Sequence, residues 1–286
     1  MTVHARVAAA RERLRAAGIA NGEAELDARL LAQHALGWDA VRLLTEGHNA
    51  EPPADFAPVY ERLVARRTAR EPIAYIIGEQ EFWGLSFEVS PAVLIPRPET
   101  ELLVEALLDL FPRSGRPLRV ADVCTGSGCV AVASASERAE TRVVATDVSE
   151  DALALARRNA LRHQVADRIE LVRADLLEGL PGAFDAIVAN PPYVPERDRA
   201  SLAPEVREHE PAVALFAADE GLAVIRRLVT DSVDRLASGA VLICECGFGQ
   251  ADAVRELISD QRALRMIDFR RDLQGIERAA VARKVP

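Results

Sequence analysis

Lysine is nearly absent from this chain of 286 residues, and the arginines do not offset the acidic side chains. Lys284 is the only lysine, and the formal net charge is −9 at pH 7. Proteins that bind duplex nucleic acid draw most of their affinity from phosphate neutralisation by basic side chains. The acidic balance therefore argues against DNA or RNA as a direct partner.

Long apolar runs are also missing. The first residues, MTVHARVAAARERLRAAG, carry charges throughout and lack the apolar core of a secretory signal. No later run approaches the ~20 residues that a membrane-spanning helix needs. We therefore expect a soluble, cytoplasmic protein with no membrane partner.

Cysteine is scarce as well. The sequence has four, at Cys124, Cys129, Cys244 and Cys246, and none of the five histidines lies close to them. This spacing matches neither a disulfide framework nor a zinc site. We expect buried thiols and no metal.

What the sequence does contain begins with a helical region over residues 1–72. Helical periodicity covers residues 4–17, 23–36 and 54–70, and these stretches stop at Gly18, at Gly37 and before Pro72. We expect a small helical bundle. Over residues 73–96, aromatic and β-branched residues alternate around Gly84, a pattern that predicts a β-hairpin connector.

Residues 97–286 have a different pattern. Pro98, followed by Glu99 and Glu101, begins a helix, since proline suits its first turn and carboxylates suit its positive end. Beyond Pro117 the hydrophobic period switches repeatedly between strand and helix. Such alternation predicts an α/β fold, with βαβ units that form a mostly parallel, doubly wound sheet.

The first strand-to-helix turn of this sheet is glycine-rich. Strand LRVADVC leads into TGSGCVA, and the next strand ends at Asp147. Glycines such as Gly126 and Gly128 let a ligand approach the backbone, and a carboxylate at Asp147 can accept hydrogen bonds from both hydroxyls of a ribose. An adenosine-type cofactor is predicted, with a nicotinamide dehydrogenase still open because Ala131 completes the G-x-G-x-x-[GA] pattern.

Two further carboxylates favour S-adenosyl-L-methionine over a dinucleotide. Asp122 ends the first strand, where it would repel a pyrophosphate but suits a ligand with a cationic amino-acid end. Asp175 follows the third strand, where its side chain can meet the exocyclic amine of adenine.

The fourth strand ends in Asn190, Pro191, Pro192 and Tyr193. The Asn190 side-chain oxygen and the Pro191 carbonyl can accept two N–H bonds from a planar amide or amine, so that its nitrogen lone pair turns toward a methyl donor. Proline has a fixed φ and no N–H, which leaves a stiff backbone with a free carbonyl. The Tyr193 ring offers a face for a planar substrate group.

These residues resemble those of the PrmC/HemK methyltransferases, which modify the glutamine amide in the Gly-Gly-Gln motif of peptide chain release factors. The likeness covers nearly the whole chain and includes YIIGEQEFWGLSFEVSPAVLIPRPETE, DVCTGSGCVA, IVANPPYVP and EPAVALF. The connector stretch is the most discriminating, because amino-methyltransferases that act on nucleic acid share Asn-Pro-Pro-Tyr but not this segment.

The resemblance implies a class I, Rossmann-like methyltransferase with a seven-stranded sheet in residues 97–286. It also implies that S-adenosyl-L-methionine contacts Cys124, Thr125, Gly126, Ser127, Gly128, Asp147 and Leu176. To these predicted cofactor contacts we add Asp122, Asp175 and Asn190. By the same likeness, Asn190, Pro191, Pro192 and Tyr193 hold the glutamine, and the partner is a release factor that docks on the helical domain of residues 1–72. No heptad or apolar tail calls for association, so we expect a monomer.

One stretch departs from the family pattern. The family usually has Gly-Gly-x-Asp-Gly after EPAVALF, whereas this chain has Ala217 and Ala218 at the two glycine positions. Alanine would strain the turn if either position needs a positive φ.

Besides the nicotinamide dehydrogenase, two alternatives to a glutamine methyltransferase remain. One is a methyltransferase for the exocyclic amine of adenine in DNA or RNA, which needs a basic channel and base flipping. The other is a nonenzymatic scaffold that binds S-adenosyl-L-methionine and a translation factor.

Overall fold

The computed structural model describes residues 1–48, 51–112 and 115–286. These residues form two units, and the chain returns to the first one late in the sequence. The first unit is Met1–Gly78 with Ala203–His209, and the second is Glu79–Leu202 with Glu210–Pro286.

The first unit is helical, as predicted. Its helices are α1 (Val3–Ala16), α2 (Asn21–Leu36), α3 (Ala40–Glu46), α4 (Phe56–Thr68), α5 (Ile73–Ile77) and α9 (Pro204–His209). Phe56 and Tyr60 of α4 lie in its apolar core, and the Tyr60 hydroxyl donates to the Ala28 carbonyl at 2.9 Å. Gly37 ends α2 with φ 63°, the left-handed conformation that glycine adopts easily.

A buried ion-pair cluster connects α2, α4 and α9 inside this unit. The Arg67 guanidinium donates to Asp27 at 2.7 Å and to Glu205 at 2.8 Å, and Arg70 donates to Glu205 at 2.7 Å. Asp27 and Arg67 are each only 4% exposed. Because both members of the pair have partners, the charges can remain inside the helical unit.

Three helices of this unit, α3, α5 and α9, were not predicted. Ile73–Ile77 was assigned to paired strands on its β-branched residues, but it forms α5, which ends at Gly78 with φ 86°. Ala74, Tyr75 and Ile76 are buried, and this packing outweighs their strand propensity. The short helix α3 was missed; the Asp39 side chain caps it by accepting from the Arg42 N–H at 2.7 Å.

The predicted hairpin is present around Gly84. Strands β1 (Glu79–Phe82) and β2 (Leu85–Glu88) are antiparallel, and the two turn residues, Trp83 and Gly84, have φ 56° and 68°. Positive φ at both positions is the turn that matches the twist of a hairpin. Trp83 is held there by its N–H, which donates to Glu101 at 2.7 Å, and by its ring N–H, which donates to Glu137 at 2.9 Å.

The second unit contains the predicted doubly wound sheet. Its strands are β3 (Leu118–Val123), β4 (Thr141–Asp147), β5 (Ile169–Arg173), β6 (Phe184–Ala189), β9 (Leu236–Glu245), β10 (Leu264–Arg271) and β11 (Glu277–Lys284). The seven strands have the order β10-β11-β9-β6-β3-β4-β5, and β11 alone is antiparallel to its neighbours β9 and β10. The predicted α/β class is confirmed. A small parallel pair, β7 (Val194–Pro195) and β8 (Phe216–Ala217), lies outside this sheet.

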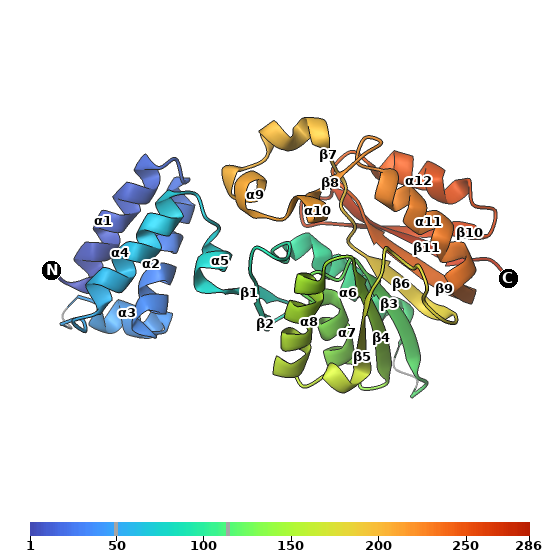
Figure 1. Ribbon diagram of the computed structural model, residues 1–286, viewed down its shortest axis with the longest axis horizontal. Coiled ribbons are helices and arrows are strands. Elements are labelled where there is room, and N and C mark those ends of the chain that lie inside the picture. Colours follow the sequence, from blue (N-terminus) through green and yellow to red (C-terminus); the bar gives the residue numbers. More distant parts are fainter. Residues whose placement is uncertain (49–50, 113–114) are drawn as a thin grey trace. The chain divides into compact units, whose positions relative to one another are not determined.

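Helices cover both faces of the sheet (Figure 1). On one face lie α6 (Glu101–Leu110), α7 (Cys129–Glu137) and α8 (Glu150–Arg162), and on the other lie α11 (Ala223–Arg235) and α12 (Ala251–Ser259). The short helix α10 (Ala212–Leu215) precedes β8. Each face of the sheet has its own apolar core: a first core under α6 and α7, and a second core under α11 and α12. In β3, Val120 packs into the first core and Ala121 and Val123 into the second, because successive side chains of a strand point to opposite faces.

The order of the strands decides where a ligand can bind. From β3 the chain moves outward to β4 and β5, then returns to β6 on the other side of β3. Ligands of such sheets bind beyond the carboxyl ends of the strands at the point where the order reverses, which is here between β3 and β6. Across the part of the chain that the structure describes, no helix has the length and apolar character to cross a membrane.

Candidate functional site

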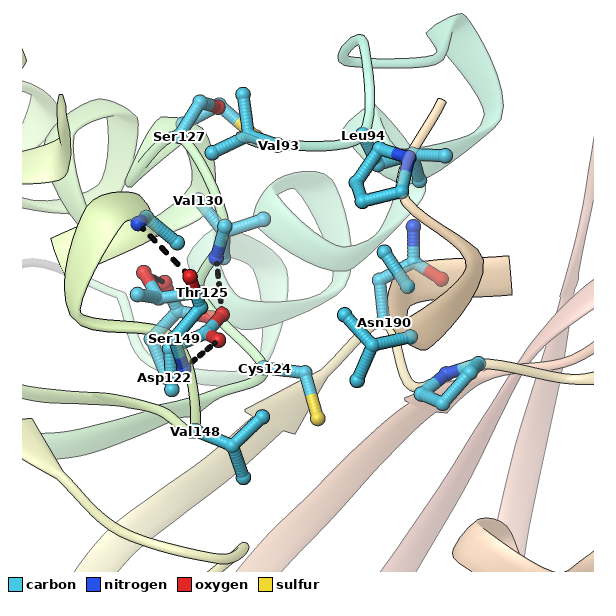
Figure 2. Close-up of a pocket in the computed structure, with 18 of the residues that line it drawn as sticks. Val93, Leu94, Asp122, Cys124, Thr125, Ser127, Val130, Val148, Ser149 and Asn190 are labelled. Atoms are coloured by element: carbon cyan, nitrogen blue, oxygen red, sulfur yellow. Dashed lines mark hydrogen bonds between the residues drawn. The ribbon is translucent and has the colours of Figure 1, made fainter. Parts of the chain in front are cut away.

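A pocket of about 270 Å³ lies in the second unit, beyond the carboxyl ends of β3, β4, β5 and β6. Figure 2 shows Thr125 and Ser149 on one side of it and Leu94 and Asn190 on the other. The predicted residues that line it are Asp122, Cys124, Thr125, Gly126, Ser127, Asp147, Asp175, Leu176, Asn190 and Pro192. Residues up to 132 positions apart in sequence, Ala92 and Val224, thus line the same pocket.

Three predicted residues lie next to this pocket but are not part of its lining. Gly128 begins α7, where an added Cβ would lie 3.0 Å from the Ala156 Cβ, so it allows close packing of α7 on α8. Pro191 is buried, and the half-buried Tyr193 packs against the second core of the sheet. These three residues shape the backbone around the pocket.

The glycine loop leaves β3 in a left-handed conformation. Cys124, Gly126 and Gly128 have φ 60°, 54° and 79°. A Cβ built on Gly126 would meet no atom within 4 Å, so its backbone borders open space. Cys124 holds this conformation without the freedom of glycine, a strain of order 1 kcal/mol that is often found at binding sites.

Asp122, near the end of β3, fixes the glycine loop by two hydrogen bonds. Its Oδ2 accepts from the Thr125 hydroxyl at 2.5 Å and from the Ala131 N–H at 3.1 Å. Burial raises the pKa of this carboxyl to about 7, although the two bonds oppose the shift. Asp122 therefore ties the start of α7 to the end of β3 and also lines the pocket.

Asp147 is held by two backbone groups. Its Oδ2 accepts from the Gly126 N–H at 3.0 Å and its Oδ1 from the Ser149 N–H at 2.9 Å. Burial raises the pKa of Asp147, while these bonds act in the opposite direction. A carboxylate has about four lone-pair sites, so these backbone bonds leave capacity for a further donor from the pocket.

Asp175 and Leu176 follow β5. Asp175 accepts from the Arg227 guanidinium at 2.9 Å, and both side chains of this pair are about half exposed. Leu176 is 4% exposed and has φ 54°, and its carbonyl accepts from the Thr146 hydroxyl at 2.9 Å. A second non-glycine residue in the left-handed region thus lines the same pocket.

Asn190 is oriented by a chain of hydrogen bonds. Its Nδ2 donates to the Thr100 hydroxyl oxygen at 3.0 Å, and the Thr100 hydroxyl donates to Glu245 Oε2 at 2.7 Å. The Tyr193 hydroxyl donates to the other Glu245 oxygen at 3.2 Å. Burial raises the pKa of Glu245 to about 7, and burial together with Glu245 raises that of Tyr193.

The backbone beside Tyr193 is clamped from two loops. Gln250 Nε2 donates to the carbonyls of Tyr193 at 2.9 Å and of Glu220 at 3.1 Å. A Cβ on Gly221 would lie 2.0 Å from the Tyr193 carbonyl oxygen, and Gly221 has φ 82°. No residue larger than glycine fits there without a shift of the backbone.

The expected strain at Ala217 and Ala218 is absent. Neither has a positive φ, and Ala217 lies in β8. The left-handed residues of this turn are instead Asp219, with φ 54°, and Glu220, with φ 55°. The two alanines therefore fit the backbone that the chain adopts.

The cysteines are free thiols. Cys129, Cys244 and Cys246 are buried as predicted, while Cys124 is half exposed and lines the pocket. Among the residues that the structure describes, no group of three histidine, cysteine or carboxylate side chains is placed to hold a metal.

Sequence reasoning missed Thr100 and Glu245. Thr100 lies in PRPETE, which was singled out for its resemblance but given no chemical role. Glu245 stands in the apolar strand LICEC, and a carboxylate in a buried strand must find partners. A carboxylate inside an apolar strand is thus the sequence feature that could have indicated a role for Glu245.

Comparison with known proteins relates both units to one family. The PrmC N-terminal domain matches residues 7–78, and the Methyltransferase small domain matches residues 98–209. Release factor glutamine methyltransferase of Bradyrhizobium diazoefficiens is 41% identical over 266 residues, 92% of this chain and 89% of that protein. The protein of the same description from Koribacter versatilis is 42% identical, over 91% of each chain.

A solved methyltransferase from Pyrococcus furiosus has the same fold as this chain. Its TM-score is 0.54 at 19% identity, and the match covers 79% of this chain and 98% of that one. The predicted resemblance and fold class are both confirmed.

Proposed function

The chain belongs to the release factor glutamine methyltransferase family, and from this premise we propose that it methylates the glutamine side-chain amide of the Gly-Gly-Gln motif in peptide chain release factors. The observation that supports the proposal most directly is the orientation of the Asn190 side-chain amide. Asn190 lines the pocket, and its Nδ2 is bonded to Thr100, so Oδ1 is the atom left to face a substrate.

The reaction needs positioning more than a strong base. An amide nitrogen is a poor nucleophile because its lone pair is delocalised into the carbonyl. Asn190 Oδ1 and the Pro191 carbonyl would accept its two N–H bonds and turn the lone pair out of conjugation. The proton can leave after the transfer, and such positioning contributes up to roughly 7–11 kcal/mol in well-oriented systems.

The pocket fits S-adenosyl-L-methionine, which when bound supplies an electrophilic methyl group on a sulfonium. Asp147 would accept from the ribose hydroxyls with the capacity that its two backbone bonds leave. Gly126 borders open space, so a ligand can approach its backbone. Leu176 would flank the adenine, with Asp175 near its amine, and Asp122, Cys124, Thr125, Ser127 and Gly128 would form the rest of the loop.

The remaining roles follow from the family. Pro192 and Tyr193 would shape the glutamine site, with Tyr193 as its packing ring. Residues 1–72 would dock the release factor, and residues 73–96 would connect them to the methyltransferase domain of residues 97–286. We propose a monomeric, cytoplasmic enzyme without a direct nucleic-acid or membrane partner.

Intact-mass analysis of a purified release factor tests the function. After incubation with this protein and S-adenosyl-L-methionine, a gain of one methyl group on the Gly-Gly-Gln glutamine is expected. Parallel reactions with duplex DNA and with RNA test the nucleic-acid alternative. Cofactor binding by calorimetry without any methylated product would instead support a scaffold.

A further inference from the structure

A buried carboxylate holds the Asn-Pro-Pro-Tyr stretch at both ends. One oxygen of Glu245 accepts from Tyr193, and the other accepts from Thr100, which in turn accepts from Asn190. Glu245 and Thr100 are 1% and 2% exposed. All four residues belong to the second unit, and Thr100 and Asn190 line the pocket.

The polarity of this chain of bonds is fixed by one proton. A threonine hydroxyl has a single proton to donate, and an ionised carboxylate can only accept. The Thr100 proton therefore goes to Glu245, and only oxygen lone pairs remain to face Asn190. Such an acceptor selects the NH₂ end of the Asn190 amide, which directs Oδ1 away from Thr100.

A purely structural role explains less of the arrangement. A carboxylate in an apolar strand costs free energy that an apolar residue would avoid. Among the described residues, no arginine or lysine lies within ion-pair distance of Glu245, so it does not complete a salt bridge. Its two hydrogen bonds go instead to the two hydroxyls that lead to Asn190 and Tyr193.

We propose that Thr100 and Glu245 are positioning residues for methyl transfer, which set the orientation of the Asn190 amide so that Oδ1 is presented to the substrate amide. This inference rests on the proposed function. It concerns two residues that act through Asn190.

The groups that act on Glu245 from the surrounding elements explain why its charge state matters. Thr100 and Tyr193 act on it by hydrogen bonds, and Glu99 and Arg278 act on it by charge. The buried thiols of Cys129, Cys244 and Cys246 also lie near Glu245, and burial together with the Glu245 charge raises their pKa values so that they stay neutral. A protonated Glu245 could donate to Thr100 and release the Thr100 proton toward Asn190. The selection of one amide orientation would then be lost.

Thr100→Val tests the role of the hydroxyl, since valine has nearly the same shape and cannot hydrogen-bond. We expect kcat for release factor methylation to fall about 10- to 100-fold, with KM for the release factor and Kd for the cofactor changed less than about threefold. Thr100→Ser restores the hydroxyl and should return kcat to within about threefold of wild type. Thr230→Val, the same change on the exposed face of α11, is the matched control.

The results separate two kinds of failure. A wild-type protein that methylates no release factor would overturn the proposed function itself. If wild type is active, a Thr100→Val variant with more than half the wild-type kcat overturns the positioning role. Equal losses in Thr100→Val and Thr100→Ser, or a loss confined to cofactor affinity, also overturn it.

A pH profile gives a second readout if Thr100→Val does not fold. Wild-type kcat should fall at least about threefold as the pH drops from 8 to 6, because Glu245 becomes protonated. Glu245→Gln does not titrate and should lack this acid limb, while its cofactor affinity stays constant. The same limb in both proteins would contradict the proposal.

Discussion

Two buried carboxylates, Asp27 in the helical unit and Glu245 in the methyltransferase unit, have different kinds of partner. In the helical unit, Asp27 and Arg67 form an ion pair whose cation has a second carboxylate partner, Glu205. In the methyltransferase unit, Glu245 is buried with two hydroxyl partners and leads through Thr100 to the pocket. The difference suggests that the ion-paired Asp27 serves the stability of its unit, whereas Glu245, which has hydroxyl partners, serves the chemistry of the pocket.

The largest expected effect is on stability in the helical unit. Arg67→Met removes the cation and leaves Asp27 buried without a partner, which should lower the free energy of unfolding of this unit by about 3–5 kcal/mol. Trp38 and Trp83 are the two tryptophans of the chain and lie in different units. Urea unfolding followed by Trp38 fluorescence in a Trp83→Phe background measures the helical unit alone.

Arg66→Met is the control for this comparison. Arg66 pairs with Glu71, and its side chain is 44% exposed, so the change should cost no more than about 1 kcal/mol. Equal losses in the two variants would mean that burial does not distinguish the pairs.

The next effect is on turnover in the methyltransferase unit. Asn190→Ala removes the proposed acceptor and should lower kcat roughly 100- to 1,000-fold, with cofactor binding intact. A radiolabelled-methyl assay measures transfer, and calorimetry measures binding. Asn21→Ala, at an exposed position in α2, is the control, and unchanged turnover in Asn190→Ala would refute the assigned role.

A smaller effect is expected on cofactor affinity. Asp147→Asn replaces an ionised acceptor by a neutral amide of the same shape and should weaken binding of S-adenosyl-L-methionine about 10- to 100-fold. Calorimetric titration gives the dissociation constant. Asp151→Asn, on the exposed first turn of α8, should bind like wild type. The proposed ribose contact would be wrong if both variants bound alike.

The smallest effect is an opposite pH dependence of stability in the two units. Burial raises the folded pKa of Glu245 to about 7, so its contribution to stability is largest below about pH 4.5 and is lost as the pH rises toward 7. For Glu205, burial acts upward, but the bonds from Arg67 and Arg70 lower the pKa. Its contribution is therefore present above about pH 4.5 and is lost as the pH falls further.

Unfolding followed by Trp83 fluorescence in a Trp38→Phe background measures the Glu245 part. Between pH 5 and 7, wild type should lose stability relative to Glu245→Gln with a slope of about 1 kcal/mol per pH unit. A difference between the two proteins that does not vary with pH would mean that Glu245 keeps one charge state in this range.

The sequence predicted the sheet well because each strand carries its own apolar pattern, from β3 to β11. Local signals also located the glycine loop and Asn190. The helix α5 was misjudged, since IAYII has strand-like residues whose burial decides their conformation. The bond between Thr100 and Glu245 joins residues 145 positions apart, and no local pattern indicates which distant partner a buried carboxylate will meet.

The return of the chain to the helical unit at Ala203–His209 has a consequence for the exchange of modules between relatives. A fragment that ends at Gly78 would leave Arg67 and Arg70 without Glu205, their acceptor on α9. A recombination event that moves the helical unit into another protein would therefore have to transfer two separate coding segments, for Met1–Gly78 and for Ala203–His209. Alternatively, the α9 of the recipient protein would have to supply a carboxylate at the position of Glu205. The complete helical unit is therefore inherited only together with a short segment, Ala203–His209, that is encoded within the sequence of the second unit.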